Sequence, residues 1–111
     1  MKLQELMDLK EFTLLNKGKD LEREITVPYC CDLLSVAMGK MPSGSAWVTV
    51  MGNVNTLAVA SLADAACVIL AEGINLDEQA LEKAKEQEIT VLRTTLPIFE
   101  AALLIHQKVH D

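Results

Sequence analysis

Three short aliphatic runs in the second half of the chain each end in small or polar residues. The runs cover residues 47–51, 67–70 and 89–92. Each run is followed by a turn and then by a segment with helical spacing of its apolar residues. Repetition of strand, turn and helix is typical of a parallel sheet with crossover helices. The pattern predicts an α/β fold with a small, largely parallel sheet flanked by helices. It also places the strand ends along one edge, where such sheets bind ligands.

Two of the connecting segments have recognisable helix starts. Asn53 is a suitable N-cap for a helix with apolar positions from residue 54 to residue 65. Asn75, with Glu78 three residues later, resembles a capping box and predicts a helix over residues 76–87. The small residues of the first helix would let it pack closely on a sheet.

The first 45 residues have a weaker pattern. The expected elements are a short helix over residues 2–9 and strands over residues 12–15 and 24–27. Pro28 either ends the second strand or places it at a sheet edge. Asp32 is expected to cap a further helix that ends near Gly39. The pattern leaves open whether this region joins the main sheet.

The last helix, predicted over residues 97–110 with Pro97 in its first turn, has apolar residues on two faces. One face includes Ala101 and Ile105 and suits the core of the protein. The other face contains Phe99, Leu103 and His106. One apolar stripe is enough for a helix in a monomer, so the second stripe predicts contact with another chain, most simply in a homodimer. A helix that is deeply buried in its own domain is the alternative.

The length of 111 residues suits one domain, which we divide into a lead-in over residues 1–45 and a β-α-β-α-β-α core over residues 46–111. Sixteen acidic and ten basic residues give a net charge of −6. This balance argues against nucleic acid and anionic membrane surfaces as partners, because both require basic patches. No apolar run reaches the roughly 18–20 residues of a membrane span, and the N-terminus has no signal-peptide core. We therefore expect a cytoplasmic protein.

The chain has no catalytic motif. Ser43-Gly44-Ser45 lies in a loop but lacks the full spacing and the lysine of a phosphate-binding loop. His106 and His110 share one helix face and would need a third ligand to hold a metal. The cysteines lack the spacing of a metal site or a disulfide framework, and Cys67 is expected to lie in the core. We predict no enzyme activity, no metal and no cofactor.

Most of the chain, and residues 52–105 most clearly, resembles the DRTGG domain family. Val68-Ile69-Leu70 and residues 94–101 fit the pattern of that family. The Asp-Arg of its name falls on Asn53-Val54, and its Thr-Gly-Gly falls on Ala71-Glu72-Gly73, so only the last glycine is kept. The resemblance implies a fold like the N-terminal domain of HPr kinase/phosphorylase and a regulatory, often dimeric, module. The HPr kinase catalytic domain and its phosphate-binding loop are absent, so no kinase activity is implied.

These observations together predict a non-catalytic regulatory or ligand-sensing module that works as a homodimer. A nucleotide-like small molecule suits the helix start at Asn53, whose free N–H groups favour an anion, although Glu72 places negative charge beside it. The alternative hypothesis is a scaffolding subunit that binds a protein partner in a metabolic or regulatory complex and no ligand. The predicted ligand site comprises Gly52, Asn53, Asn55, Thr56, Glu72, Gly73, Thr94 and Thr95.

Overall fold

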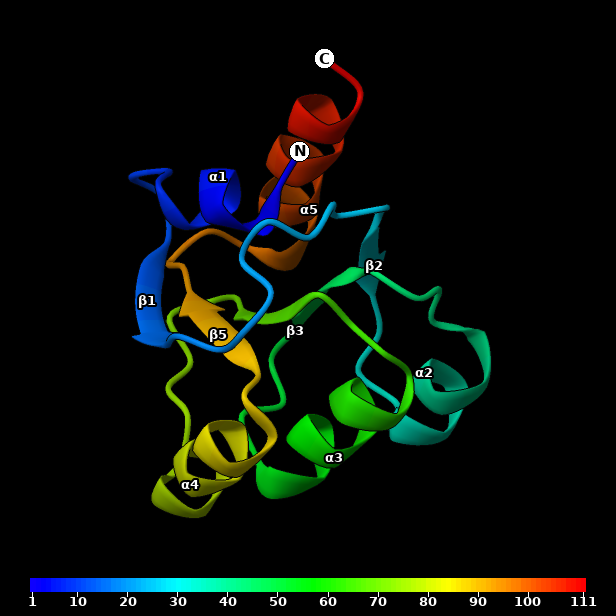
Figure 1. The fold of residues 1–111 in the computed structure, drawn as a ribbon, viewed down its shortest axis with the longest axis vertical. Helices are drawn as coiled ribbons and strands as arrows, with labels where there is room; N and C mark the ends of the chain where they lie inside the picture. The colour runs from blue at the N-terminus through cyan, green and yellow to red at the C-terminus, as the bar shows by residue number, and fades with distance from the viewer.

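The computed structural model describes residues 1–111 as five helices and five strands (Figure 1). The helices are α1 (Leu3–Met7), α2 (Leu34–Lys40), α3 (Val54–Leu62), α4 (Glu78–Gln87) and α5 (Ile98–Val109). The strands are β1 (Thr13–Asn16), β2 (Pro28–Cys30), β3 (Ala46–Thr49), β4 (Cys67–Leu70) and β5 (Thr90–Arg93). None of these helices combines the length and the apolar character that a membrane crossing requires.

All five strands form one sheet in the order β1-β5-β4-β3-β2. Strands β2 to β5 run parallel, whereas β1 pairs antiparallel with β5. In the centre of the sheet, Thr49 lies opposite Leu70, and Leu70 lies opposite Arg93. The predicted parallel arrangement of the three aliphatic runs is therefore confirmed, and their carboxyl ends share one edge of the sheet.

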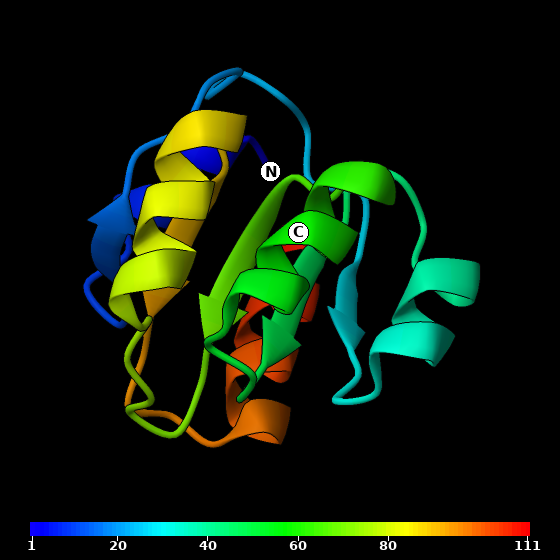
Figure 2. The ribbon, with the colours of Figure 1, turned by 90° about the horizontal axis from the view of Figure 1, so that it is seen from below.

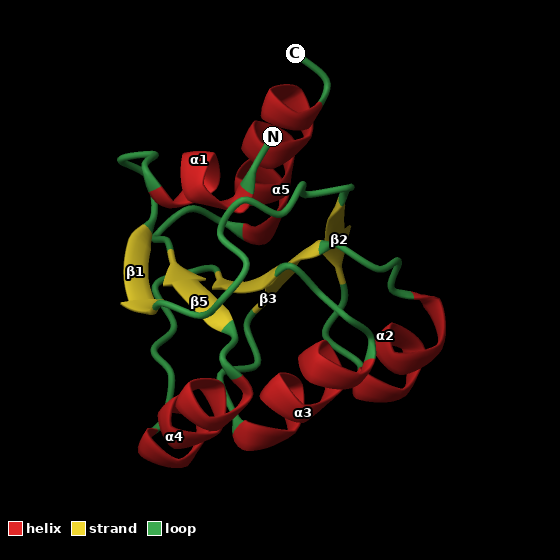
Figure 3. Cartoon of the chain, in the orientation of Figure 1, coloured by secondary structure: helices red, strands yellow, loops and turns green.

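Helices cover both faces of the sheet (Figure 3). On one face lie α2, α3 and α4; Figure 2 shows α3 and α4 in front of the strands and α2 beside β2. On the other face lie α1 and α5. The four parallel strands follow one another in space in their chain order. Every crossover between them therefore has the same hand and returns on the same face.

Alternate residues of the central strands build two separate cores. Trp47 and Val68 pack toward α2, α3 and α4, whereas Val48 and Ile69 pack toward α1 and α5. All four side chains are fully buried. Because both faces of the sheet are covered, each strand has a continuous apolar sequence in place of an alternating one.

The lead-in, residues 1–45, contributes both edge strands of the sheet, β1 on one side and β2 on the other. The prediction of a strand over residues 24–27 is wrong, since the strand begins at Pro28. Residues 24–27 lie outside the sheet and make main-chain hydrogen bonds to other segments, such as the bond from the Ile25 N–H to the Met1 carbonyl oxygen (2.8 Å). Pro28 is the first residue of β2, which lies at the edge of the sheet. An edge position was one of the two alternatives expected for this proline.

The prediction that Asp32 caps α2 is also wrong. The N-cap of α2 is Leu33, which makes no side-chain capping bond. The Asp32 carboxylate instead accepts hydrogen bonds from Thr49 Oγ1 (2.6 Å) and from the Val50 N–H (3.0 Å). Asp32 therefore ties the turn after β2 to the end of β3.

The caps of α3 and α4 follow the expected chemistry. Asn53 caps α3, which confirms the prediction. The cap of α4 is Asp77, whose Oδ1 accepts from the Ala80 N–H (2.8 Å), and the prediction of Asn75 as the cap is wrong by two positions. Asn75 and Asp77 both have short polar side chains that suit an N-cap, so the spacing of the sequence does not show which of them caps the helix.

Candidate functional site

The turns that follow β3, β4 and β5 lie side by side at the carboxyl edge of the sheet, and they bond to one another through the main chain. The Gly73 N–H donates to the Thr94 carbonyl oxygen (2.9 Å), and the Asp77 N–H donates to the Gly52 carbonyl oxygen (3.2 Å). These bonds close the space between neighbouring strand ends. The two cavities of the structure both lie elsewhere.

Several predicted ligand residues at this edge are engaged within the fold. Asn53 Oδ1 accepts from the Thr56 N–H (3.1 Å) and lies 3.4 Å from Thr56 Oγ1. Thr56 and Thr94 are buried, and Thr94 Oγ1 accepts from the Leu96 N–H (3.1 Å). The exposed members of the predicted site are Asn55, Glu72 and Thr95. A ligand at this edge would thus meet these three side chains first.

The two glycines of this edge serve the packing of the turns. A Cβ at Gly52 would lie 2.5 Å from the Asn75 carbonyl oxygen. Gly73 has a φ of 72°, in the left-handed region that favours glycine. Arg93, which is not among the predicted site residues, donates from Nε to the Gly73 carbonyl oxygen (3.1 Å). Turn packing accounts for both glycines, and ligand binding at this edge stays a prediction.

No group of three His, Cys, Asp or Glu side chains is placed to hold a metal ion. Cys67 lies in the core, as predicted, and burial raises the pKa of its thiol to about 12, so that it stays protonated and unreactive. His106 on α5 and His110 at the C-cap of that helix are both exposed, with ring centroids 4.2 Å apart.

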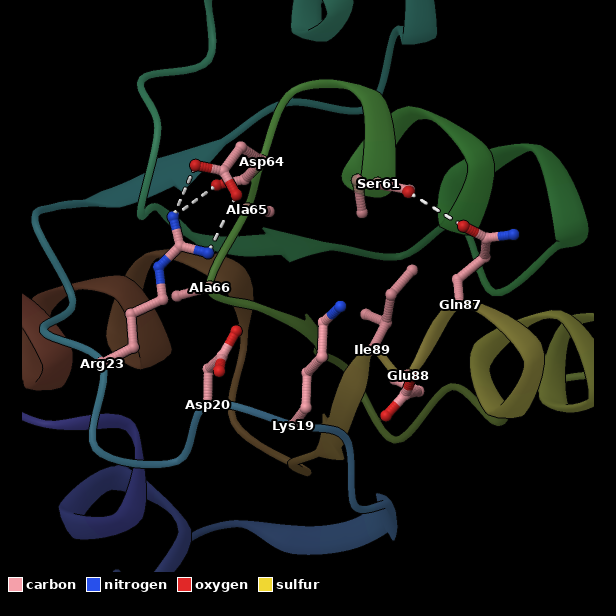
Figure 4. Close-up of a pocket in the computed structure, with 11 residues that line it drawn as sticks. Lys19, Asp20, Arg23, Ser61, Asp64, Ala65, Ala66, Gln87, Glu88 and Ile89 are labelled. Atoms are coloured by element: carbon pink, nitrogen blue, oxygen red, sulfur yellow. Dashed lines mark hydrogen bonds and ion pairs between the residues drawn. The ribbon is translucent and has the colours of Figure 1, made fainter.

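The larger cavity, of about 300 Å³, lies at the opposite edge, where β4 and β5 begin (Figure 4). The loop after β1 forms one wall. The C-terminal ends of α3 and α4, with the residues that follow them, form the others. The charged residues that line it are Lys19, Asp20, Arg23, Asp64 and Glu88.

Main-chain contacts with β5 hold the loop after β1 in place. The Gly18 N–H donates to Thr90 Oγ1 (2.9 Å), and the Lys19 N–H donates to the Glu88 carbonyl oxygen (3.2 Å). Gly18 approaches β5 so closely that a Cβ would lie 2.6 Å from the Thr90 nitrogen. This close approach carries Lys19 and Asp20 to the cavity.

Arg23 and Asp64 form a two-pronged ion pair at one end of the cavity. The guanidinium donates to Asp64 Oδ1 (2.9 Å) and Oδ2 (2.8 Å), and also to the Asp64 carbonyl oxygen (2.9 Å). Ser43 Oγ donates to the same carboxylate. The hydrogen bonds from Arg23, followed by that from Ser43, hold the pKa of Asp64 below its usual value. The charge of Arg23 is thus already balanced within the protein.

On the wall opposite the loop, Ser61 Oγ donates to Gln87 Oε1 (3.1 Å), which links α3 to α4. This site could not be recognised from the sequence, because three residues around it, Asp20, Asp64 and Glu88, have positive φ angles without being glycine. Such turns leave no glycine signal in the sequence.

Comparison with known proteins agrees with this fold. The DRTGG domain family matches residues 5–108. Among solved structures, the chain is similar to the crystal structure of the CBS and DRTGG domains of the regulatory region of Clostridium perfringens pyrophosphatase, complexed with its activator diadenosine tetraphosphate. The TM-score is 0.77 at 17% sequence identity. The match covers 96% of this chain and 46% of that one, so this chain spans about half the length of that structure.

No curated protein matches the sequence. The TM-score shows that this chain and the solved structure share a fold, and at 17% identity the likeness shows the fold alone. The family match extends from residue 5 to residue 108. It includes the segments on which the sequence resemblance was based. The chain belongs to the DRTGG domain family.

Proposed function

We propose that this DRTGG domain is a non-catalytic regulatory module that acts as a homodimer, with α5 as its contact surface. The main support for this proposal is the exposure of large apolar side chains on the outer face of α5. Phe99 and Leu103, four residues apart, are 68% and 39% exposed, whereas Ala101 and Ile105 on the inner face are fully buried. Two large apolar side chains on one exposed helix face are typical of a protein contact.

The charge distribution favours a second copy of this chain as the occupant of that face. The protein carries a net charge of −6, so two copies repel each other wherever acidic surfaces meet. Helix α5 has one acidic residue, Glu100, and one lysine, Lys108, and these charges cancel. By contrast, α4 has three glutamates and two lysines over its ten residues. Contact through α5 therefore brings two copies together with little electrostatic cost.

Leu103→Glu is expected to convert the homodimer into a monomer. The change places one carboxylate from each copy in an apolar contact, which should raise the dissociation constant at least about tenfold. Sedimentation equilibrium or light scattering at high micromolar concentration measures the effect. Leu62→Glu is the matched control, because Leu62 is 73% exposed on α3, on the other face of the sheet. A monomeric wild-type protein, or equal effects of the two variants, would exclude α5 as the contact.

The carboxyl edge of the sheet is the proposed place for a regulatory ligand of nucleotide type. The N-terminal end of α3 lies at this edge, and helix N-termini favour phosphate groups. The similar regulatory region of Clostridium perfringens pyrophosphatase is complexed with a dinucleotide activator. A ligand that binds one dimer arrangement more tightly than another would shift the population between them.

Calorimetric titration with diadenosine tetraphosphate separates this ligand-sensing role from the scaffolding alternative. Asn55→Asp should weaken binding about tenfold or more, because it adds an exposed negative charge at the start of α3. That variant should fold normally, since an acidic residue suits the first turn of a helix. Gln87→Glu adds the same charge at the opposite edge and should leave binding unchanged. Absence of heat for the wild-type protein would favour a scaffold without a ligand.

A further inference from the structure

We propose that the cavity at the amino edge of the sheet binds a small zwitterion of the α-amino acid type, with Asp20 as the partner of its ammonium group and Lys19 as the partner of its carboxylate. This site lies at the edge of the sheet opposite to the proposed nucleotide site. It is independent of the α5 contact.

Lys19 and Asp20 project into the same cavity although they are neighbours in the chain (Figure 4). Consecutive residues of an extended segment point to opposite sides. Asp20 has a φ of 57°, and this left-handed turn brings both side chains to one side. An ammonium and a carboxylate thus stand next to each other at the cavity wall.

Neither of these two charged groups has an ion-pair partner in the protein. The four ion pairs of the structure involve other residues, and the two groups do not pair with each other. Arg23, the other cation of the cavity, is bonded to Asp64. Lys19 is therefore the cation available for a ligand carboxylate, and Asp20 is available for a ligand ammonium.

The surroundings favour a zwitterion over a simple anion. Glu88 adds a second free carboxylate at the cavity, and α3 and α4 both direct their C-terminal ends toward it. Helix C-termini carry partial negative charge, which stabilises a bound ammonium and opposes phosphates. A simple cation would leave Lys19 without a partner. A ligand with one charge of each sign satisfies both groups.

The rest of the cavity wall is largely polar, with Ser61 and Gln87 beside small apolar residues, and it suits the small side chain of an amino acid. Ala60, Ala65, Ala66 and Ile89 line it, and three of these four residues are alanines with little bulk. A volume of about 300 Å³ is at the lower end of the range for ligand pockets, so the cavity accommodates a molecule the size of an amino acid. A dinucleotide exceeds this volume.

Titration of isotope-labelled protein with L-leucine, L-valine and L-methionine, followed by amide chemical shifts, tests the proposal. At least one of these probes should shift the signals of Ala65, Ala66 and Ile89. N-acetyl-leucine, which lacks the ammonium, and leucine methyl ester, which lacks the carboxylate, should each bind at least about tenfold more weakly than leucine. The signals of the carboxyl edge should not move, which distinguishes this site from the proposed nucleotide site.

Three variants complete the test. Asp20→Asn removes the charge and keeps a residue that tolerates positive φ, and Lys19→Gln removes the other charge. Both should weaken binding at least about tenfold, whereas Lys17→Gln, in the same loop but outside the cavity, should not. The proposal is overturned if no probe shifts the cavity signals up to high millimolar concentration. It is also overturned if the two leucine analogues, which need no variant protein, bind as tightly as leucine itself.

Discussion

Trp47→Ala is expected to lower the free energy of unfolding by about 3–5 kcal/mol, a large share of the roughly 5–15 kcal/mol that stabilises an ordinary domain. Trp47 is the largest fully buried side chain and lies at the centre of the core beneath α2 and α3. Its Nε1–H also donates to the Cys31 carbonyl oxygen (2.9 Å). The truncation therefore leaves a cavity and an acceptor without its partner. Because Trp47 is the only tryptophan, urea unfolding should be followed by circular dichroism.

Trp47→Phe separates packing from hydrogen bonding at the same position. Phenylalanine keeps much of the ring volume and loses the N–H donor, so we expect an intermediate cost of about 1–3 kcal/mol. A Trp47→Ala variant within about 1 kcal/mol of the wild-type protein would contradict the placement of this side chain in the core.

Gly18→Ala is expected to cost about 2–4 kcal/mol of stability and to abolish binding in the cavity at the amino edge. The added methyl group would lie 2.6 Å from the Thr90 nitrogen and would also contact the Glu88 carbonyl oxygen. Both are main-chain atoms, which cannot move aside as a flexible side chain can. The loop must therefore leave β5 and lose its hydrogen bond to Thr90 Oγ1. Unfolding in urea and the amino acid titration measure the two effects.

Gly39→Ala is the matched control for this substitution. A Cβ at Gly39 meets no atom within 4 Å, and the residue lies within α2. Alanine is favoured over glycine in a helix, so this variant should be as stable as the wild-type protein or more stable by up to about 1 kcal/mol. If the two alanine variants have equal stability, the loop after β1 does not contact β5 as described.

The central part of the fold could be predicted because its signals are local. Strand β4 was predicted at its observed bounds, and Asn53 was identified as the cap of α3. Continuous apolar runs and caps depend on residues close together in the chain. Strand β2 has only three residues and no such pattern. The alternation at residues 24–27 is typical of a strand, but in the structure the Thr26 N–H donates to the Gly44 carbonyl oxygen in a loop.

The candidate sites show the same difference between local and long-range information. The sequence placed the three strand ends at one edge because parallel strands share a direction. It did not show that the turns there bond directly to one another, as Gly73 does to Thr94. The cavity depends on contact between Gly18 and Thr90, which are 72 positions apart. No spacing rule relates residues at that separation, and the left-handed turn at Asp20 carries no glycine to reveal it.

The two edge strands of the sheet, β1 and β2, should make the protein resistant to aggregation through strand pairing. Strand β2 has three residues and begins with Pro28, which lacks an N–H donor, and β1 has an irregular register between Leu14 and Asn16. Short, interrupted or proline-containing borders are poor templates for adding a strand from another molecule. The protein should therefore resist fibre formation even at high concentration, and ordered self-association is directed away from the borders of the sheet and toward its helices.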